Sequence, residues 1–354
     1  MSRRGTAERS GRRAVVIAVT VAVVGLVLAA LPAHAAPDGK AKKLDLSDVT
    51  VRVGYSAVRD TSTQDVRLAS GEFDNTPYEI KWAEFSGSSA ALQAMNAGAI
   101  DITPETMALN VILAQASAKT PMTRETAPFT IVLGGEAPPE SGAVIAVRPD
   151  SGIKSVKDLK GKKVTYVRGG VSQLWWTIAS HEAGLKKGDV ETAELVVADG
   201  RAAFLSGAID AIVGQHRTLI PLVSSGEAKI IAASDGRVPE YRLTLVRNGF
   251  MDDKKQAAAV ADFVKRLQRS RQWLQTHQKQ AAAVYEKSAA VTPEDAKAAV
   301  AEFPMTNLAL DNEFAKKLQA QSEVFYTDGV TATFPKVSIL FDRRYDVTGK
   351  STTE

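Results

Sequence analysis

The chain has 354 residues, of which 44 are basic and 40 acidic, and it contains no cysteine. This composition excludes a disulfide framework, a thiol nucleophile and a thiolate metal site. After residue 35 the histidines are His181, His216 and His277, and no two of them have the spacing of a helical metal site. Motifs of serine hydrolases, phosphate-binding loops, dinucleotide-binding folds and zinc peptidases are missing as well. We therefore expect no metal, no cofactor and no catalytic activity.

The first 35 residues have the pattern of a secretory signal peptide. Five arginines lie among residues 3–13, an apolar run covers 14–31, and Ala33-His34-Ala35 offers a cleavage site. We expect export to the periplasm with cleavage after Ala35 and no lipid attachment. A retained membrane anchor is the alternative, because the run approaches the length of a spanning helix. Both the Sec and the twin-arginine export routes stay open.

The excess of positive charge belongs to this predicted leader. Without its five arginines and Glu8 the chain keeps 39 basic and 39 acidic residues. A chain with balanced charge lacks the electrostatic footprint of a nucleic-acid-binding protein. The remaining length suffices for two domains with hydrophobic cores.

Strand and helix patterns then alternate along the chain. The first series predicts strands at 51–55, at 78–82 and from Ile100, with helices at 63–70 and ending at Asn96. The second series predicts strands at 163–167, at 194–197 and from Gly207, with a helix through Trp175 to Ala183 and another capped by Asp199.

A short repeat connects the two series. Gly-Ala-Ile-Asp occurs at 98–101 and at 207–210, each time between an alanine-rich helix and a strand. This arrangement predicts an α/β fold of two lobes with similar βαβ structure. Turn residues at 149–152 and 234–236 are the candidate crossings between the lobes. The remainder is predicted to be mostly helical, with a 3.6-residue apolar period through 260–267.

Several longer motifs extend over most of the chain. They are Val51-Arg-Val-Gly-Tyr55, Trp82-Ala-Glu-Phe85, the runs 92–101 and 151–164, Arg201-Ala-Ala-Phe204, Gly207-Ala-Ile-Asp210 and Phe341-Asp-Arg-Arg-Tyr345. Together they resemble the aliphatic sulfonate, taurine and nitrate group of ABC-transporter solute-binding proteins, in the type II periplasmic binding protein superfamily. The resemblance implies a Venus-flytrap fold in which 48–148 and 237–345 form one lobe and 152–234 the other. It also implies a small anionic or zwitterionic ligand, an ABC permease as partner, and a monomer.

Ligands of open α/β sheets bind beyond the carboxyl ends of the strands, where helices begin. Helix N-termini present unpaired N–H groups and partial positive charge to an anion. Serine hydroxyls add donors, and glycine lets the backbone approach the ligand. The residues that we expect in the cleft are Ser56, Gly87, Ser88, Ser89, Glu105, Thr106, Gly170, Val171, Ser172, Gln173, Gln215, His216 and Arg217.

For several of these residues the pattern leaves two interpretations. Arg217 either holds two ligand oxygens with its guanidinium or is a solvated arginine at a helix start. Glu105 either pairs with a ligand ammonium, as taurine carries, or faces solvent. His216 is expected to be a hydrogen-bonding neighbour rather than a catalyst. Of Trp175 and Trp176, one is expected in the core and the other beside the cleft.

The sequence thus predicts the extracytoplasmic solute-binding component of an ABC importer, which binds a small organic sulfonate such as an alkanesulfonate or taurine. The segments 103–107 and 213–217 depart from the group's usual pattern and face the cleft in the family. Nitrate, bicarbonate and a pyrimidine precursor therefore remain alternative ligands. An enzyme on the same fold and a sensor subunit are the alternative classes of protein.

Overall fold

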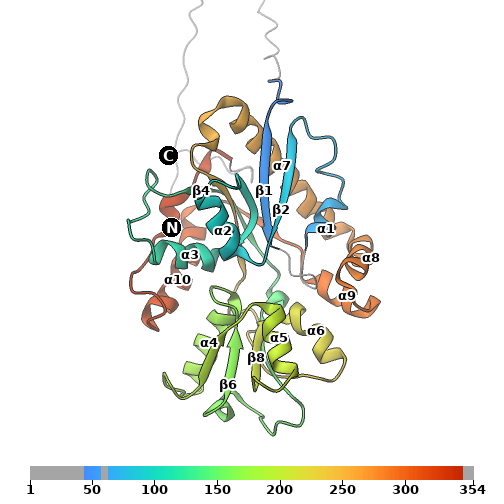
Figure 1. Ribbon diagram of the computed structural model, residues 1–354, viewed down its shortest axis with the longest axis vertical. Helices are drawn as coiled ribbons and strands as arrows, with labels where there is room; N and C mark the ends of the chain where they lie inside the picture. Colours follow the sequence, from blue (N-terminus) through green and yellow to red (C-terminus); the bar gives the residue numbers. More distant parts are fainter. Residues whose placement is uncertain (1–43, 57–62, 346–354) are drawn as a thin grey trace, which may run out of the picture. The chain divides into compact units, whose positions relative to one another are not determined.

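Two β-sheets organise the computed structural model, which describes residues 44–56 and 63–345 (Figure 1). The first sheet has the order β11-β4-β10-β3-β1-β2, with β1 (Thr50–Ser56), β2 (Glu79–Phe85), β3 (Ile102–Met107), β4 (Phe129–Glu136), β10 (Tyr241–Arg247) and β11 (Thr306–Leu308). The second has the order β7-β6-β8-β5-β9, with β5 (Ala143–Val147), β6 (Lys163–Tyr166), β7 (Glu191–Glu194), β8 (Ala211–Gln215) and β9 (Lys229–Ala233). The predicted two-lobed α/β fold is confirmed. The predicted leader, residues 1–35, lies outside the described residues.

Each sheet carries its own helices (Figure 1). The second lobe has α4 (Val171–Glu182), α5 (Val197–Leu205) and α6 (His216–Ser224). The first lobe has α1 (Gln64–Leu68), α2 (Ser88–Asn96), α3 (Ala108–Ala116), α7 (Lys254–Thr276), α8 (Gln278–Ala289), α9 (Pro293–Ala301) and α10 (Asn312–Thr327). The predicted apolar period lies on α7, where Val260, Phe263 and Val264 are buried in the same core cluster as Val51 of β1. No helix in the described ranges is long and apolar enough to cross a membrane.

The repeated Gly-Ala-Ile-Asp motif makes the same contacts in both lobes. Asp101 donates its N–H to the carbonyl of Arg52 (2.7 Å), and its carboxylate accepts the N–H of Arg52 (3.1 Å). Asp210 does the same with Lys163, at 2.9 Å and 2.8 Å. Each aspartate therefore fixes the start of a parallel βαβ unit. By these contacts β1 of the first lobe corresponds to β6 of the second, and their carboxyl ends occupy equivalent positions in the two lobes.

The first crossing between the lobes lies earlier than predicted. Ala143–Val147 is fully buried and pairs antiparallel with β8 and β9, so β5 belongs to the second lobe and not to a first lobe ending at residue 148. The crossing is at 137–142, and the turn at 149–152 lies within the second lobe. The chain returns between β9 and β10. The two crossing segments are hydrogen-bonded to each other, because Ala137 N–H donates to the Glu240 carbonyl (3.0 Å).

Candidate ligand-binding cleft

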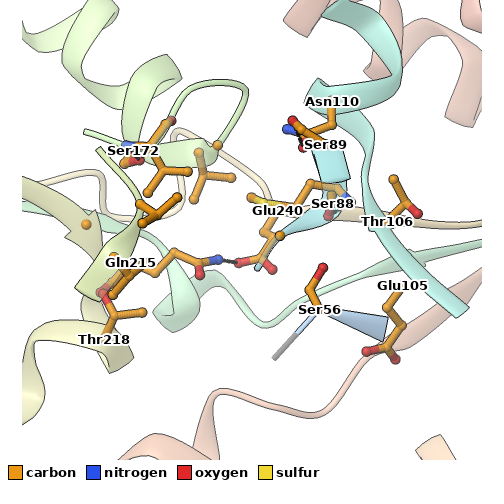
Figure 2. Close-up of a pocket in the computed structure, with 18 of the residues that line it drawn as sticks. Ser56, Ser88, Ser89, Glu105, Thr106, Asn110, Ser172, Gln215, Thr218 and Glu240 are labelled. Carbon is orange, nitrogen blue, oxygen red and sulfur yellow. Dashed lines mark hydrogen bonds between the residues drawn. The ribbon is translucent and has the colours of Figure 1, made fainter. Parts of the chain in front are cut away.

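A cleft of about 480 Å³ lies between the two lobes and is lined by both. It is at the carboxyl ends of the parallel strands β1, β2 and β3 on one side and β6, β7 and β8 on the other. Figure 2 shows Ser56, Ser88 and Ser89 on one wall and Ser172, Gln215 and Thr218 on the opposite wall. This is the position at which α/β sheets bind ligands.

Eleven of the thirteen residues expected in the cleft line it: Ser56, Gly87, Ser88, Ser89, Glu105, Thr106, Gly170, Val171, Ser172, Gln215 and Arg217. Gln173 is buried behind the lining, where its side-chain oxygen accepts the N–H of Gly169 (2.8 Å). His216 also lies outside the lining and contacts Glu302 instead. Trp175 and Trp176 are both buried, so the expected tryptophan beside the cleft is wrong.

Five helices begin at the cleft, namely α2, α3, α4, α5 and α6, whose N-cap residues Gly87, Met107, Gly170, Val196 and Gln215 all line it. Among the described residues, none of these five N-cap residues uses its own side chain to hydrogen-bond the first N–H groups of its helix. The first N–H groups of a helix also lack partners within the helix. The backbone therefore offers several donors to an anion in the cleft.

Two of the expected serines fix loops and do not cap their own helices. The hydroxyl oxygen of Ser88 accepts the N–H of Met107 (3.2 Å), and that of Ser172 accepts the N–H of Val167 (3.2 Å). Each bond ties the start of a helix, α2 or α4, to a neighbouring segment of its lobe. The first residues of α2 and α4 line the cleft, so their N–H groups are available at its surface.

Asn110 connects these two helix N-termini across the cleft. Ser89 of α2 donates its hydroxyl to the Asn110 side-chain oxygen (3.1 Å), and the Asn110 amide donates to the carbonyl of Gly169, just before α4. Gly169 has a φ of 67°, and a Cβ built on it would lie 2.3 Å from the Asn110 amide nitrogen. A glycine at this position thus allows the two lobes to touch beside the helix N-termini.

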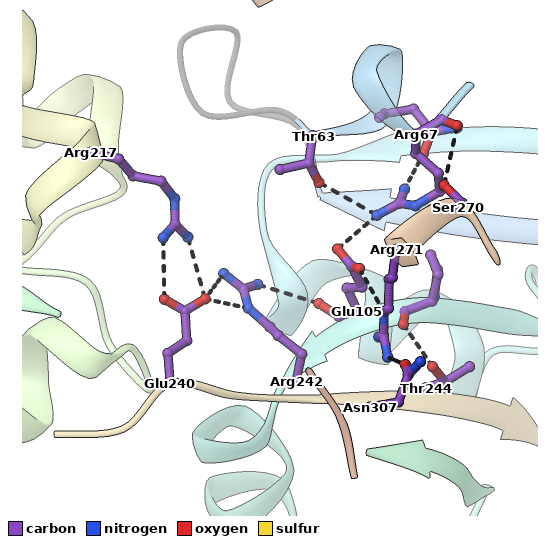
Figure 3. Close-up of polar contacts among 12 residues, drawn as sticks. Thr63, Arg67, Glu105, Arg217, Glu240, Arg242, Thr244, Ser270, Arg271 and Asn307 are labelled. Carbon is purple, nitrogen blue, oxygen red and sulfur yellow. Dashed lines mark hydrogen bonds and ion pairs between the residues drawn. The ribbon is translucent and has the colours of Figure 1, made fainter. Parts of the chain in front are cut away.

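Glu105 is held by arginines, contrary to both interpretations from the sequence. Its carboxylate contacts Arg67 (2.7 Å) and Arg271 (3.4 Å), while its carbonyl accepts from Arg242 (3.3 Å), as Figure 3 shows. Burial would raise the pKa of Glu105, but the guanidinium groups of Arg67 and Arg271 outweigh it and lower the pKa. The carboxylate is half-buried in the cleft lining and already has two guanidinium partners, so it does not require a ligand ammonium.

Arg217 is likewise paired within the protein. Its two terminal nitrogens contact the Glu240 carboxylate at 3.4 and 3.3 Å, and its side chain is 7% exposed (Figure 3). Glu240 also accepts from Arg242 and from the amide of Gln215. Burial would raise the pKa of Glu240, but Arg217 and Arg242 lower it to about 2. Arg217 is therefore neither a solvated arginine nor a free guanidinium.

Glu302 occupies the N-terminus of α6. Its carboxylate accepts the backbone N–H of Arg217 (3.1 Å) and lies 2.5 Å from Nδ1 of His216. The hydrogen bond to Glu302 raises the pKa of His216. His216 is thus a hydrogen-bonding neighbour, as predicted. Because a protein carboxylate already uses the start of α6, an anionic ligand has the other four helix starts available, and Asn110 brings those of α2 and α4 together.

Arginines outnumber carboxylates in the buried ion network beside the cleft. Arg67, Arg217, Arg242 and Arg271 face Glu105, Glu240 and Glu302. The four guanidinium groups outnumber the three carboxylates, and protonation of His216, which the contact with Glu302 favours, adds to this positive excess. Opposite charges favour each other strongly where water is excluded. The cleft therefore suits an anionic ligand. In the described ranges, no group of three or more His, Asp or Glu side chains could hold a metal ion.

Sequence reasoning missed the carboxylates and the amide that organise this site. Glu240 follows Pro239 at the start of a buried strand, and Asn110 interrupts the apolar run of α3. A single polar residue in an apolar segment is a usable signal, because buried polar groups need partners. The partners themselves, such as Arg217 for Glu240, come from distant parts of the chain.

The fold and the cleft between its lobes define a two-lobed binding-protein architecture. The crystal structure of the periplasmic aliphatic sulphonate-binding protein SsuA from Escherichia coli has a similar fold, with a TM-score of 0.68 over 86% of this chain and 96% of that one, at 23% identity. The desulfurization enzyme DSZB has it too, with a TM-score of 0.61 over 83% of this chain and 97% of that one, at 13% identity. The predicted type II periplasmic-binding-protein fold is thereby confirmed.

The chain belongs to the NMT1/THI5-like family, whose model matches residues 79–281. It is also 37% identical over 133 residues to an aliphatic sulfonates-binding protein of Escherichia coli (strain K12). That match covers 38% of this chain and spans 39% of the length of the relative. The resemblance predicted from the motifs, to the aliphatic sulfonate-binding group, is confirmed.

Proposed function

We propose that this protein is the extracytoplasmic solute-binding component of an ABC importer and that it binds a small organic sulfonate between its lobes. One observation carries the proposal: the N-termini of α2 and α4 lack side-chain caps and are connected across the cleft by Asn110. Backbone N–H groups from both lobes are thereby available to one anion. A sulfonate has three acceptor oxygens and a negative charge, which suits the positive excess of the buried network.

The wider parts of the proposal rest on the leader pattern and on the relatives. A cleavable leader at residues 1–35 would deliver the chain to the periplasm, where the related sulphonate-binding protein is found. There the protein would act as a monomer that passes its ligand to a membrane permease. It would bind without chemistry, since the charged residues of the cleft pair with one another and none of the described lining residues is placed as an activated nucleophile.

A panel of anions tests the proposal through the melting temperature. At a concentration one hundred times its Kd, a ligand of the native state stabilises the protein by about 2.7 kcal/mol. We expect a clear rise in melting temperature with alkanesulfonates and a smaller one with nitrate or bicarbonate. Taurine should bind no better than ethanesulfonate, because Glu105 is already neutralised by Arg67 and Arg271 and offers nothing to an ammonium.

Two outcomes of this panel would contradict the proposal. A pyrimidine precursor that shifts the melt while every sulfonate fails would leave the binding role but exclude the sulfonate ligand. Conversion of a bound compound into a product would exclude the binding-only function.

A further inference from the structure

We infer that the second lobe selects the organic body of the ligand with an aliphatic wall, formed by Val167, Leu195, Val196 and Val197. These four residues line the cleft and follow the carboxyl ends of β6 and β7. The inference rests on the proposed function, in which the sulfonate lies at the starts of α2 and α4. It adds that the preferred ligand is a monoanionic sulfonate with an apolar body of several carbons, and that Val196 determines this specificity.

The internal repeat reveals the wall, because equivalent positions of the two lobes carry opposite chemistry. Helices α2 and α5 each begin ten residues before their Gly-Ala-Ile-Asp motif, so the polar pair Gly87-Ser88 corresponds to the apolar pair Val196-Val197. The contacts of Arg52 and Lys163 with the two motif aspartates likewise align Ser56 with Val167. The first lobe presents hydroxyl groups and bare backbone where the second presents methyl groups.

Neighbouring strands hold the wall together at one edge of the second sheet. Tyr166 of β6 pairs in register with Glu194 of β7, so Val167 and Leu195 follow side by side. Leu195 also donates its N–H to the carbonyl of Tyr166 (3.1 Å). The segment 194–197, predicted as a strand, instead leaves β7 and enters α5. Its apolar residues therefore lie outside the sheet and line the cleft.

The wall is partly open to solvent. Val196 is 42% exposed, and Leu195 and Val197 are half-buried, although all three are apolar. Burial of apolar surface against a ligand contributes about 25 cal/mol per Å². Hydroxyl groups dominate the facing wall, as Figure 2 shows for Ser56, Ser88 and Ser89. A ligand with one polar and one apolar end fits this division.

Charge pairing in the cleft favours an apolar body over a cationic one. Glu194, the carboxylate next to the wall, contacts Arg168 at 3.3 Å. The other carboxylates of the lining, Glu105, Glu240 and Glu302, are held by arginine or histidine as described above. Within the described chain each carboxylate of the lining thus has a protein partner. An ammonium near the wall would be desolvated without a counter-ion, which is unfavourable.

Calorimetric titration of the purified chain with methane-, butane- and hexanesulfonate and with benzenesulfonate tests this inference. Each methylene buried on an apolar surface contributes about 0.8 kcal/mol, so Kd should fall about threefold to fourfold per methylene along the series. Val196→Ser should raise the Kd of hexanesulfonate about fourfold and leave that of methanesulfonate unchanged. Serine suits the N-cap position of α5, so the variant should fold. Leu205→Ser is the matched control, because Leu205 ends the same helix, is 47% exposed and lies outside the cleft.

The outcomes separate this inference from the proposed function. If methane- and hexanesulfonate bind equally, or if Val196→Ser weakens both by the same factor, the aliphatic wall has no selective role while sulfonate binding stands. If no sulfonate binds to the unaltered chain, the proposed function itself is wrong. Tighter binding of either hexanesulfonate or benzenesulfonate than of methanesulfonate supports the wall, and the difference between the two shows which shape of apolar body it prefers.

Discussion

Glu240→Gln is expected to lower the free energy of unfolding by about 3–5 kcal/mol, the cost of removing one partner from a buried ion network. Glu240 is 3% exposed and accepts from Arg217 and Gln215 of the second lobe and from Arg242 of the first. The substitution leaves two guanidinium groups buried without their counter-ion. Urea denaturation measures the loss. Glu194→Gln is the matched control, since it breaks an ion pair on the rim of the same cleft, where about 1 kcal/mol or less is expected.

The pH dependence of stability should reveal the same interaction of Glu240 with its arginine partners. The pKa of Glu240 is lowered to about 2 from an ordinary value of 4.5. A carboxylate whose folded pKa is depressed contributes stability above its unfolded pKa, and this contribution is lost as the pH falls from 4.5 towards 2. Glu240→Gln should therefore reduce the dependence of stability on pH in this window. Equal losses for Glu240→Gln and Glu194→Gln, or an unchanged pH profile, would contradict the role assigned to Glu240.

Gly169→Ala is expected to weaken sulfonate binding about tenfold or more. The new Cβ would lie 2.3 Å from the Asn110 amide nitrogen, so the contact that connects the lobes beside α2 and α4 must separate. A lost hydrogen bond costs about 0.5–1.5 kcal/mol, and displacement of the helix N-termini adds to it. Calorimetric titration with hexanesulfonate measures the change in Kd.

A second glycine provides the control for backbone strain. Gly184 has a φ of 72°, close to that of Gly169, but nothing lies within 4 Å of a Cβ built on it. Gly184→Ala should therefore destabilise the protein through strain alone and leave Kd unchanged. If both variants lose affinity equally, strain explains the effect and the contact between Asn110 and Gly169 has no part in binding.

The parts of the fold that local pattern determines were predictable from the sequence. The Gly-Ala-Ile-Asp repeat predicted two lobes of similar structure. Asp101 and Asp210 make equivalent contacts in the two lobes, which explains why the repeat indicates this similarity. Glycines and serines after strands marked Gly87, Ser88 and Gly170 as cleft residues. Periodicity cannot tell which sheet a strand joins, and this is why Ala143–Val147 was assigned to the wrong lobe.

Long-range pairing and competing propensities explain the remaining errors. Arg217 meets Glu240 and His216 meets Glu302 only through the tertiary fold, so a sequence pattern shows the charges but not their partners. The apolar run after Glu194 favours a strand by its β-branched residues. The strand is instead the polar segment Glu191–Glu194 at the edge of the sheet, and the apolar run that follows it lines the cleft.

A crystal structure with hexanesulfonate, with an anomalous difference map that locates the sulfur atoms, tests the central claim most directly. The chain has six methionines and no cysteine, so a bound sulfonate adds a sulfur peak to a small and known set. We predict that this peak lies between the N-termini of α2 and α4, within hydrogen-bonding distance of their N–H groups, with the alkyl chain against Val196. A peak outside the cleft, or a cleft without sulfonate at saturating concentration, would contradict the account.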